Sequence, residues 1–210
     1  KVLSLSLVFA CSRGAGPAGT PAPAEAQDAA GQVLAVAPIA GQAVSVLPIT
    51  LVLADSSTAV DPSYASYQDR RAALFRTDSL VAEALQGRAP EVHWILPPEL
   101  RKMARRAPGM LTDPDQMGQA LMRAPRLTKL PDPLRSELRS LVAIAGGRLV
   151  FIPAALGFTR DAAGRTHATL SLVLADARTG NVVWRSLATG AGESPDAALA
   201  AALAATFPVE

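Results

Sequence analysis

The chain has 210 residues, of which half are hydrophobic and only 4% aromatic, and its formal net charge at pH 7 is +2. It contains one cysteine, which excludes a disulfide within the chain. Its two histidines, His93 and His167, fall in predicted strands, and neither has a His, Cys or Asp partner at metal-ligand spacing. We therefore expect no metal and no cofactor.

The first ten residues resemble the end of an export signal. Residues 3–10 (LSLSLVFA) form an apolar run that ends in a small residue just before Cys11. Such a run is too short to span a bilayer, which needs about 20 apolar residues, but it fits the end of a secretory signal. The chain begins with Lys1 rather than Met, so we expect its natural start to lie upstream.

The stretch Val8-Phe9-Ala10-Cys11 resembles a bacterial lipobox. The resemblance implies cleavage before Cys11 and acylation of its thiol, and the absence of Asp at the next position implies sorting to the outer membrane. Each buried CH₂ group adds about 0.8 kcal/mol to membrane binding, so several acyl chains would give a stable anchor. We expect the protein to face the periplasm from this anchor. The alternative is an incidental or buried cysteine.

A flexible tether is predicted after the anchor. Residues 12–30 are rich in Gly, Ala, Pro, Thr and Ser and show no hydrophobic period. Residues 31–39 become apolar enough to begin ordering. The predicted organisation is a signal remnant at 1–10, a lipid-anchored tether at 11–40 and a single α/β domain at 41–210, which is long enough to bury a core.

A strand–helix–strand unit is predicted at the start of the domain. Residues 43–53 (AVSVLPITLVL) predict the first strand, in which Pro48 marks a bulge, an edge or the end of pairing. A loop is predicted for residues 55–66. Residues 68–86 carry apolar residues at helical spacing, and residues 92–96 predict the second strand. This order suits a βαβ unit.

Helices are predicted next. Residues 97–106 and 113–123 predict short helices, the second with Asp113 as its cap. Asp132 and the proline after it open a longer helix with one apolar stripe, and Gly146 stands where a C-terminal cap glycine belongs. We interpret these aspartates, with Asp115, as helix caps rather than as a metal or acid–base cluster.

The clearest prediction is a hairpin over residues 166–186 (THATLSLVLADARTGNVVWRS), preceded by a strand at 149–158. Leucines alternate with smaller residues on the first arm, a turn contains Gly180, and Val182 and Trp184 are predicted to share a face of the second arm. Residues 190–192 are predicted to leave the sheet. A closing helix follows, capped by Ser194 and continuing to Phe207.

A strand that ends in Asp-Ala-Arg-Thr-Gly (176–180), followed by Val-Val-Trp (182–184), resembles hairpins of three bacterial envelope groups. These are the curli-secretion lipoproteins, the penicillin-binding-protein activator lipoproteins and the N-terminal domain of the Tol-Pal β-propeller protein. The resemblance extends to the order of elements over residues 43–207. It implies an α/β fold with a mixed sheet, a βαβ start, an antiparallel meander and helices packed on the sheet. It also implies partners such as a peptidoglycan synthase or a secretion or assembly complex.

The sharpest charge feature is Arg101-Lys102-Met103-Ala104-Arg105-Arg106. Its four cations, Arg101, Lys102, Arg105 and Arg106, are candidates for contact with anionic lipid headgroups or with an acidic protein face. Nucleic acid is a poor partner for an exported protein. The alternative is a solvated helix face whose cations favour the C-terminal end of the helix dipole.

We expect a non-catalytic interaction or assembly module. No Gly-x-Ser-x-Gly elbow is present, and the one cysteine is assigned to the anchor. The alternative is a small-molecule-binding or enzymatic envelope protein without a recognisable motif. An oligomeric pore is disfavoured, because the sequence contains no extra pair of alternating apolar strands of about ten residues each.

Overall fold

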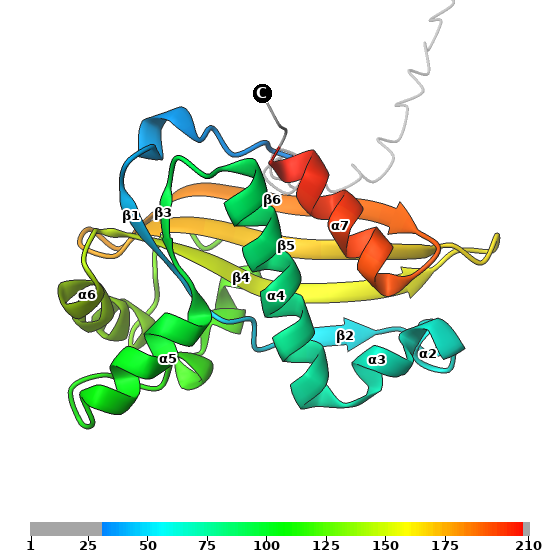
Figure 1. Ribbon diagram of the computed structural model, residues 1–210, viewed down its shortest axis with the longest axis horizontal. Helices are drawn as coiled ribbons and strands as arrows, with labels where there is room; N and C mark the ends of the chain where they lie inside the picture. Colours follow the sequence, from blue (N-terminus) through cyan, green and yellow to red (C-terminus); the bar gives the residue numbers. More distant parts are fainter. Residues whose placement is uncertain (1–30, 208–210) are drawn as a thin grey trace, which may run out of the picture.

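The computed structural model describes residues 31–207, which build a mixed six-stranded sheet with helices packed on it (Figure 1). The strand order is β3-β1-β4-β5-β6, and β2 also pairs with β4. This is the predicted α/β class. The predictions for residues 1–10, for Cys11 and for the tether at 12–30 lie outside the described residues.

The strands are β1 (Ala43–Val46), β2 (Val52–Ala54), β3 (His93–Ile95), β4 (Leu149–Arg160), β5 (Thr166–Asp176) and β6 (Asn181–Gly192). The α-helices are α2 (Ser56–Ala59), α3 (Ala65–Gln68), α4 (Arg70–Arg88), α5 (Pro97–Arg106), α6 (Leu134–Ala145) and α7 (Pro195–Thr206). Four 3₁₀ helices join them: η1 (Ala37–Ile39), η2 (Pro62–Tyr64), η3 (Pro114–Gln116) and η4 (Gln119–Arg123).

The predicted strand–helix–strand unit is confirmed. β1 pairs in parallel with both β3 and β4, and α4 lies in the crossover between the first strands and β3. The carboxylate of Asp69 accepts the N–H of Ala72 and so caps the start of α4. The helix continues one residue beyond Gly87 and ends at Arg88.

The predicted first strand is interrupted. β1 and β2 both pair with β4, but residues 48–50 leave the ladder around Pro48, between the backbone bonds that Leu47 and Leu51 make to β4. Side chains from distant segments replace the missing backbone partners. The N–H of Ile49 donates to the carboxylate of Asp78 at 2.9 Å, and the carbonyl of Pro48 accepts from the amide nitrogen of Gln119, also at 2.9 Å. A buried polar junction therefore stands where the sequence predicted continuous pairing.

The hairpin of β5 and β6 forms as predicted, with Gly180 at a φ of +78° in its turn. Asp176 accepts backbone N–H groups from the two residues after Ala177, which fixes the turn. The prediction that Val182 and Trp184 share a face is wrong, because the register shifts between positions 174 and 175. Val182 packs on one side of the sheet and Trp184 on the other.

The end of β6 also differs from the prediction. Residues 190–192 stay in the strand and pair with the start of β5. A Cβ atom at Gly190 would lie 2.2 Å from the backbone nitrogen of Ala202, so α7 can pack this closely only because the strand carries glycine there. Ser194 caps α7 as predicted, and Phe207 is fully buried.

Two hydrophobic clusters lie on opposite faces of the sheet. The first lies against α4 and α7 and includes Phe151, Phe158 and Phe207. The second lies against α5, α6 and η4 and includes Leu138 and Val173. Figure 1 shows α4 and α7 crossing one face of the long strands, whereas α6 lies at one end of the sheet. One face is therefore closed along its length and the other at one end only.

Two further segments differ from the sequence predictions in their secondary structure. The predicted loop at 55–66 contains α2, η2 and the start of α3, with Asp55 and Asp61 as caps. The predicted helix at 113–123 is two 3₁₀ turns, which are divided by Gly118 at a φ of +73°.

Residues 31–40, which the predicted boundary assigned to the tether, pack on the domain. Leu34 and Ile39 are buried in the first cluster. The N–H of Gly31 donates to the carbonyl of Leu187 on β6, and the N–H of Leu34 donates to the carbonyl of Thr206 on α7. Residues 31–40 are therefore in contact with β6, α7 and the first cluster in the described structure.

Candidate functional site

A groove between α4 and α5 contains two of the four predicted contact residues. Helix α5 begins with Pro97 and ends at Arg106, as predicted. The groove has a volume of about 350 Å³. Its lining residues are Arg71, Phe75, Arg101, Ala104, Arg105, Leu111, Asp113 and Asp115.

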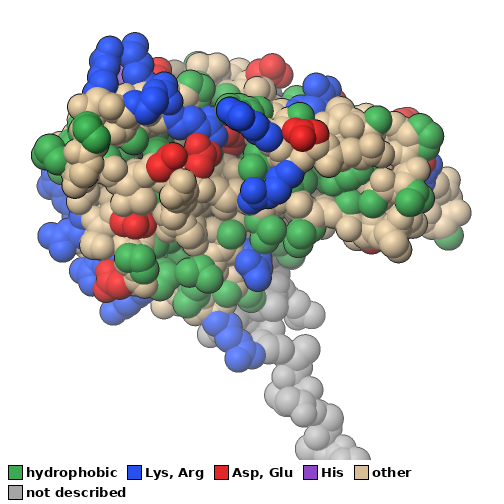
Figure 2. Space-filling view, turned by 90° about the horizontal axis from the view of Figure 1, so that it is seen from below, with side chains coloured by type: hydrophobic (Ala, Val, Ile, Leu, Met, Phe, Trp, Pro, Cys, Tyr) green, Lys and Arg blue, Asp and Glu red, His purple; other side chains and the backbone are tan. Residues whose placement is uncertain are grey.

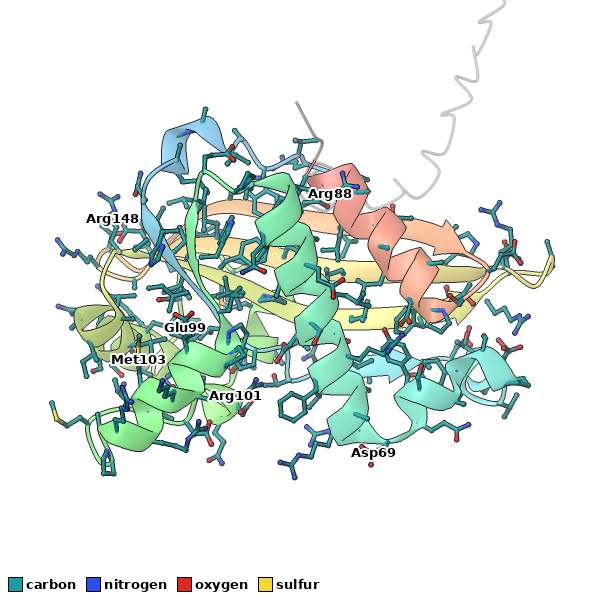
Figure 3. The ribbon with its side chains drawn as sticks, viewed as in Figure 1. Asp69, Arg88, Glu99, Arg101, Met103 and Arg148 are labelled. Atoms are coloured by element: carbon teal, nitrogen blue, oxygen red, sulfur yellow. The ribbon has the colours of Figure 1, made fainter. Side chains whose placement is uncertain are left out.

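Arg101 is held inside the protein. Its Nε and one terminal nitrogen bind both carboxylate oxygens of Asp115 at 2.8 and 2.7 Å, and the same terminal nitrogen binds Asp78 at 2.8 Å. Only 13% of the Arg101 side chain is exposed. Figure 3 shows Arg101 where α5 meets α4. This guanidinium is therefore already paired with two carboxylates, and the anionic-surface contact of the four cations stays a prediction.

Asp78 connects this cluster to the interrupted strand. One carboxylate oxygen accepts the N–H of Ile49, and the other binds Arg101. Burial raises the pKa of Asp78 to about 6, against the opposing effects of these two hydrogen bonds. The pKa of Arg101 is raised by its hydrogen bonds to Asp115 and Asp78, so it remains a cation. The three charged groups fix α4, α5 and η3 to one another.

The other predicted contact residues, Lys102, Arg105 and Arg106, are exposed on α5. Within residues 31–207 none of them forms a salt bridge, and neither does Arg71 across the groove. Phe75 is 47% exposed between the two helices. The guanidinium carbons of Arg71 and Arg101 lie 5.8 and 4.9 Å from the centre of its ring, which is cation–π geometry.

The aspartates that were predicted to cap helices have three different environments. Asp113 accepts the N–H of Asp115 and caps η3, as predicted. The side chain of Asp115 binds Arg101 instead of capping a helix. Asp132 is exposed, and α6 begins after Pro133 without a side-chain cap. The cap prediction is therefore right for Asp113 alone.

A second open surface lies on the half-covered face of the sheet. It is an apolar groove of about 530 Å³. Small residues of β4 and β5 form its floor, namely Ala155, Gly157, Thr169 and Ser171, and larger ones form its walls, namely Leu53, Leu121, Pro125 and Leu187. Figure 2 shows a thick body that narrows to a thinner arm, with apolar side chains gathered where the two meet. The only sequence signal for this surface was the alternation of leucines with Thr and Ser in β5.

The remaining polar groups do not form a catalytic or metal constellation in the described part of the chain. His167 pairs with Asp161 at 2.8 Å at an exposed strand end, and this contact lowers the pKa of the Asp161 carboxyl. His93 is exposed at the start of β3. Residues 31–207 contain no group of three or more His, Cys, Asp or Glu that could hold a metal ion. No helix in the same range is long and apolar enough to cross a bilayer.

The chain matches no family model and no curated protein. Among solved structures, it is similar to the LpoB C-terminal domain from Salmonella enterica, with a TM-score of 0.38 and 15% identity over 74% of this chain and 84% of that one. It is similar to a PelC dodecamer chain from Paraburkholderia phytofirmans, with a TM-score of 0.37 and 15% identity over 85% of this chain and 93% of that one. It is also similar to the lipoprotein GNA1162 from Neisseria meningitidis, with a TM-score of 0.31 and 16% identity over 70% of this chain and 78% of that one.

Proposed function

We propose that this chain is a lipid-anchored, non-catalytic interaction module of the bacterial envelope, attached through Cys11 to the periplasmic side of the outer membrane. The observation that carries the interaction role is the open apolar groove on the half-covered face of the sheet. The lipobox-like run before Cys11 and the Ala- and Pro-rich residues 12–30 support the anchor and a tether.

The groove has the chemistry of a protein contact. Leu53, Leu121 and Leu187 are 55%, 54% and 37% exposed around a floor of small residues. Contiguous apolar surface of this kind gains stability when a partner removes it from water. Arg123 is the one charged residue in the lining, so an apolar segment of an envelope protein is the expected occupant.

The contact can be tested with a photo-crosslinking amino acid at position 121, in the full chain in intact envelopes. We expect a discrete adduct that is lost when Leu53→Glu places a charge in the groove. Position 60 is the control, because Val60 is 81% exposed but does not line the groove. Equal adducts from positions 121 and 60 would contradict a defined contact.

The anchor needs a separate test. Cells that produce the full chain are labelled with a palmitate analogue and compared with cells that produce Cys11→Ala. We expect label only in the unmodified chain, together with movement of the variant from the membrane to the periplasmic fraction. Label that persists in Cys11→Ala would reject Cys11 as the attachment point.

A further inference from the structure

The groove between α4 and α5 indicates the chemistry of a partner. We propose that it binds an acidic peptide segment of a partner protein, whose carboxylates meet Arg71 and Arg105 and whose apolar side chain lies against Phe75. This inference rests on the proposed interaction function, but it is carried by a different surface from the sheet groove.

The three arginines that line the groove differ in whether a carboxylate pairs with them. Arg101 is paired with both Asp78 and Asp115, so it forms a fixed part of the groove wall and adds no free positive charge. Arg71 and Arg105 line the same groove and form no salt bridge within the described residues.

The three arginines of the lining are balanced by its two aspartates and by Asp78, so any net positive charge of this surface comes from cations outside the lining. The one other carboxylate in the lining, that of Asp113, accepts a backbone N–H at the start of η3. Lys102 and Arg106 add two exposed cations on the same helix, again without a salt bridge in the described part of the chain. The surface therefore presents uncompensated positive charge around a half-exposed phenyl ring, which complements carboxylates.

Phe75 gives the surface an apolar centre. Its ring lies against the guanidinium of Arg101, which two carboxylates hold in place, and against that of Arg71. Because these contacts hold the ring, little side-chain freedom is lost when a ligand covers it. A volume of about 350 Å³ is within the usual range of ligand pockets, about 300–1,000 Å³. A few side chains of a peptide fit this space, whereas a whole domain does not.

The groove lies far from the N-terminal end of the described chain. Gly31 and Leu34, where the described chain begins, bond to β6 and α7. Figure 1 places α5 and the start of α4 at the opposite side of the sheet from this edge. The groove therefore lies on the far side of the sheet from the point where the described chain begins.

The test measures fluorescence anisotropy of a labelled peptide of alternating Glu and Leu against the purified full chain, with a Gln and Leu peptide as the neutral probe. In the variant Arg71→Glu/Arg105→Glu we expect about tenfold weaker binding of the acidic peptide, since two exposed ion pairs are lost. The matched control is Arg139→Glu/Arg178→Glu, which makes the same charge change at exposed arginines of α6 and the β5–β6 turn. We expect its affinity to stay within about twofold of the unmodified chain.

Phe75→Ala tests the apolar part of the site. We expect it to weaken binding of the Glu and Leu peptide about fivefold and to leave a Glu and Ser peptide unaffected. Circular dichroism of each variant checks that the fold is retained. If both double arginine variants lose affinity for the acidic peptide equally, the proposal is overturned, because net charge rather than the groove would then control binding.

Two further outcomes separate this proposal from its alternatives. If the peptide does not bind but phosphatidylglycerol vesicles bind and are lost with Arg71→Glu/Arg105→Glu, the occupant is a lipid surface and the proposal fails. If neither probe binds while the crosslink from position 121 persists, the groove proposal fails and the proposed interaction function stands.

Discussion

The two faces of the sheet differ in how far they are closed. On one face α4 and α7 cover the long strands, and the aromatic rings of Phe151, Trp94 and Phe207 pack together. On the other face α5, α6 and η4 cover only one end, and small residues of β4 and β5 are left beside an open groove. Both faces carry a buried hydrophobic cluster, but only the half-covered face leaves an apolar groove beside its cluster.

The largest expected difference between the faces comes from a core truncation. Phe151 is fully buried, with ring centres 5.9 Å from both Trp94 and Phe207. Phe151→Ala should lower the free energy of unfolding by about 3–5 kcal/mol in urea denaturation, since it leaves a cavity. Thr169→Ala on the open face should change it by less than about 0.5 kcal/mol. Similar losses for both would remove the distinction between the faces.

The next largest difference in stability between the faces is expected from glycine-to-alanine substitutions at Gly190 and Gly157. Gly190→Ala would place a Cβ 2.2 Å from the backbone of Ala202 in α7, and it should destabilise the protein by about 1–3 kcal/mol. At Gly157, on the open side, the nearest atom to a new Cβ is 3.9 Å away, and the same substitution should cost less than about 0.5 kcal/mol. Thermal unfolding of the two variants compares them directly, and an unchanged Gly190→Ala would show that α7 is not fixed against β6.

The buried polar junction at the interrupted strand should make the stability of the protein depend on pH through Asp78. Its pKa is 3.8 in the unfolded chain and about 6 after burial, so the folded state holds the proton in a range where the unfolded state has lost it. The contribution of Asp78 to stability therefore falls as pH rises from 3.8 to about 6. Asp78→Asn cannot titrate but keeps an oxygen for the N–H of Ile49. The stability of the unmodified chain relative to this variant should decline across that window by on the order of 1 kcal/mol. If the difference in free energy of unfolding between the two proteins stays constant across this pH range, the raised pKa of Asp78 is contradicted.

The smallest stability effect is expected on the open face. Leu53→Glu and Leu121→Glu replace leucines that are more than half exposed, so the free energy of unfolding should change by less than about 0.5 kcal/mol. Leu53→Glu should nevertheless reduce the crosslink from position 121, and Leu121→Glu should reduce a crosslink from a probe at position 53. A large loss of stability in either variant would show that these leucines serve the fold rather than a contact.

Local patterns in the sequence were sufficient for much of the fold. Period-two alternation and turn chemistry around Gly180 predicted the β5–β6 hairpin, and two prolines in a first turn predicted α5. A Ser–Pro start predicted α7. These signals lie within a few residues of one another, which is why they can be found without the structure.

The sequence could not predict features that depend on distant partners. The break at Pro48 is stabilised by side chains from α4 and η4, far along the chain. Likewise, Arg101 looked like a surface cation because neither Asp78 nor Asp115 is its sequence neighbour. The open groove depends on which part of the sheet the helices of residues 31–207 leave uncovered, and local sequence patterns do not predict that.

The hydrogen bonds of Gly31 and Leu34 determine how the domain would respond to mechanical load. A pull on the N-terminal side reaches the bonds to Leu187 and Thr206 before it reaches any strand inside the sheet. Such a load would peel residues 31–36 away one contact at a time, including the bond from the indole of Trp184 to the carbonyl of Val33. Under such a load residues 31–36 would detach first and remove Leu34 from the first hydrophobic cluster, while β1 stays paired with β3 and β4.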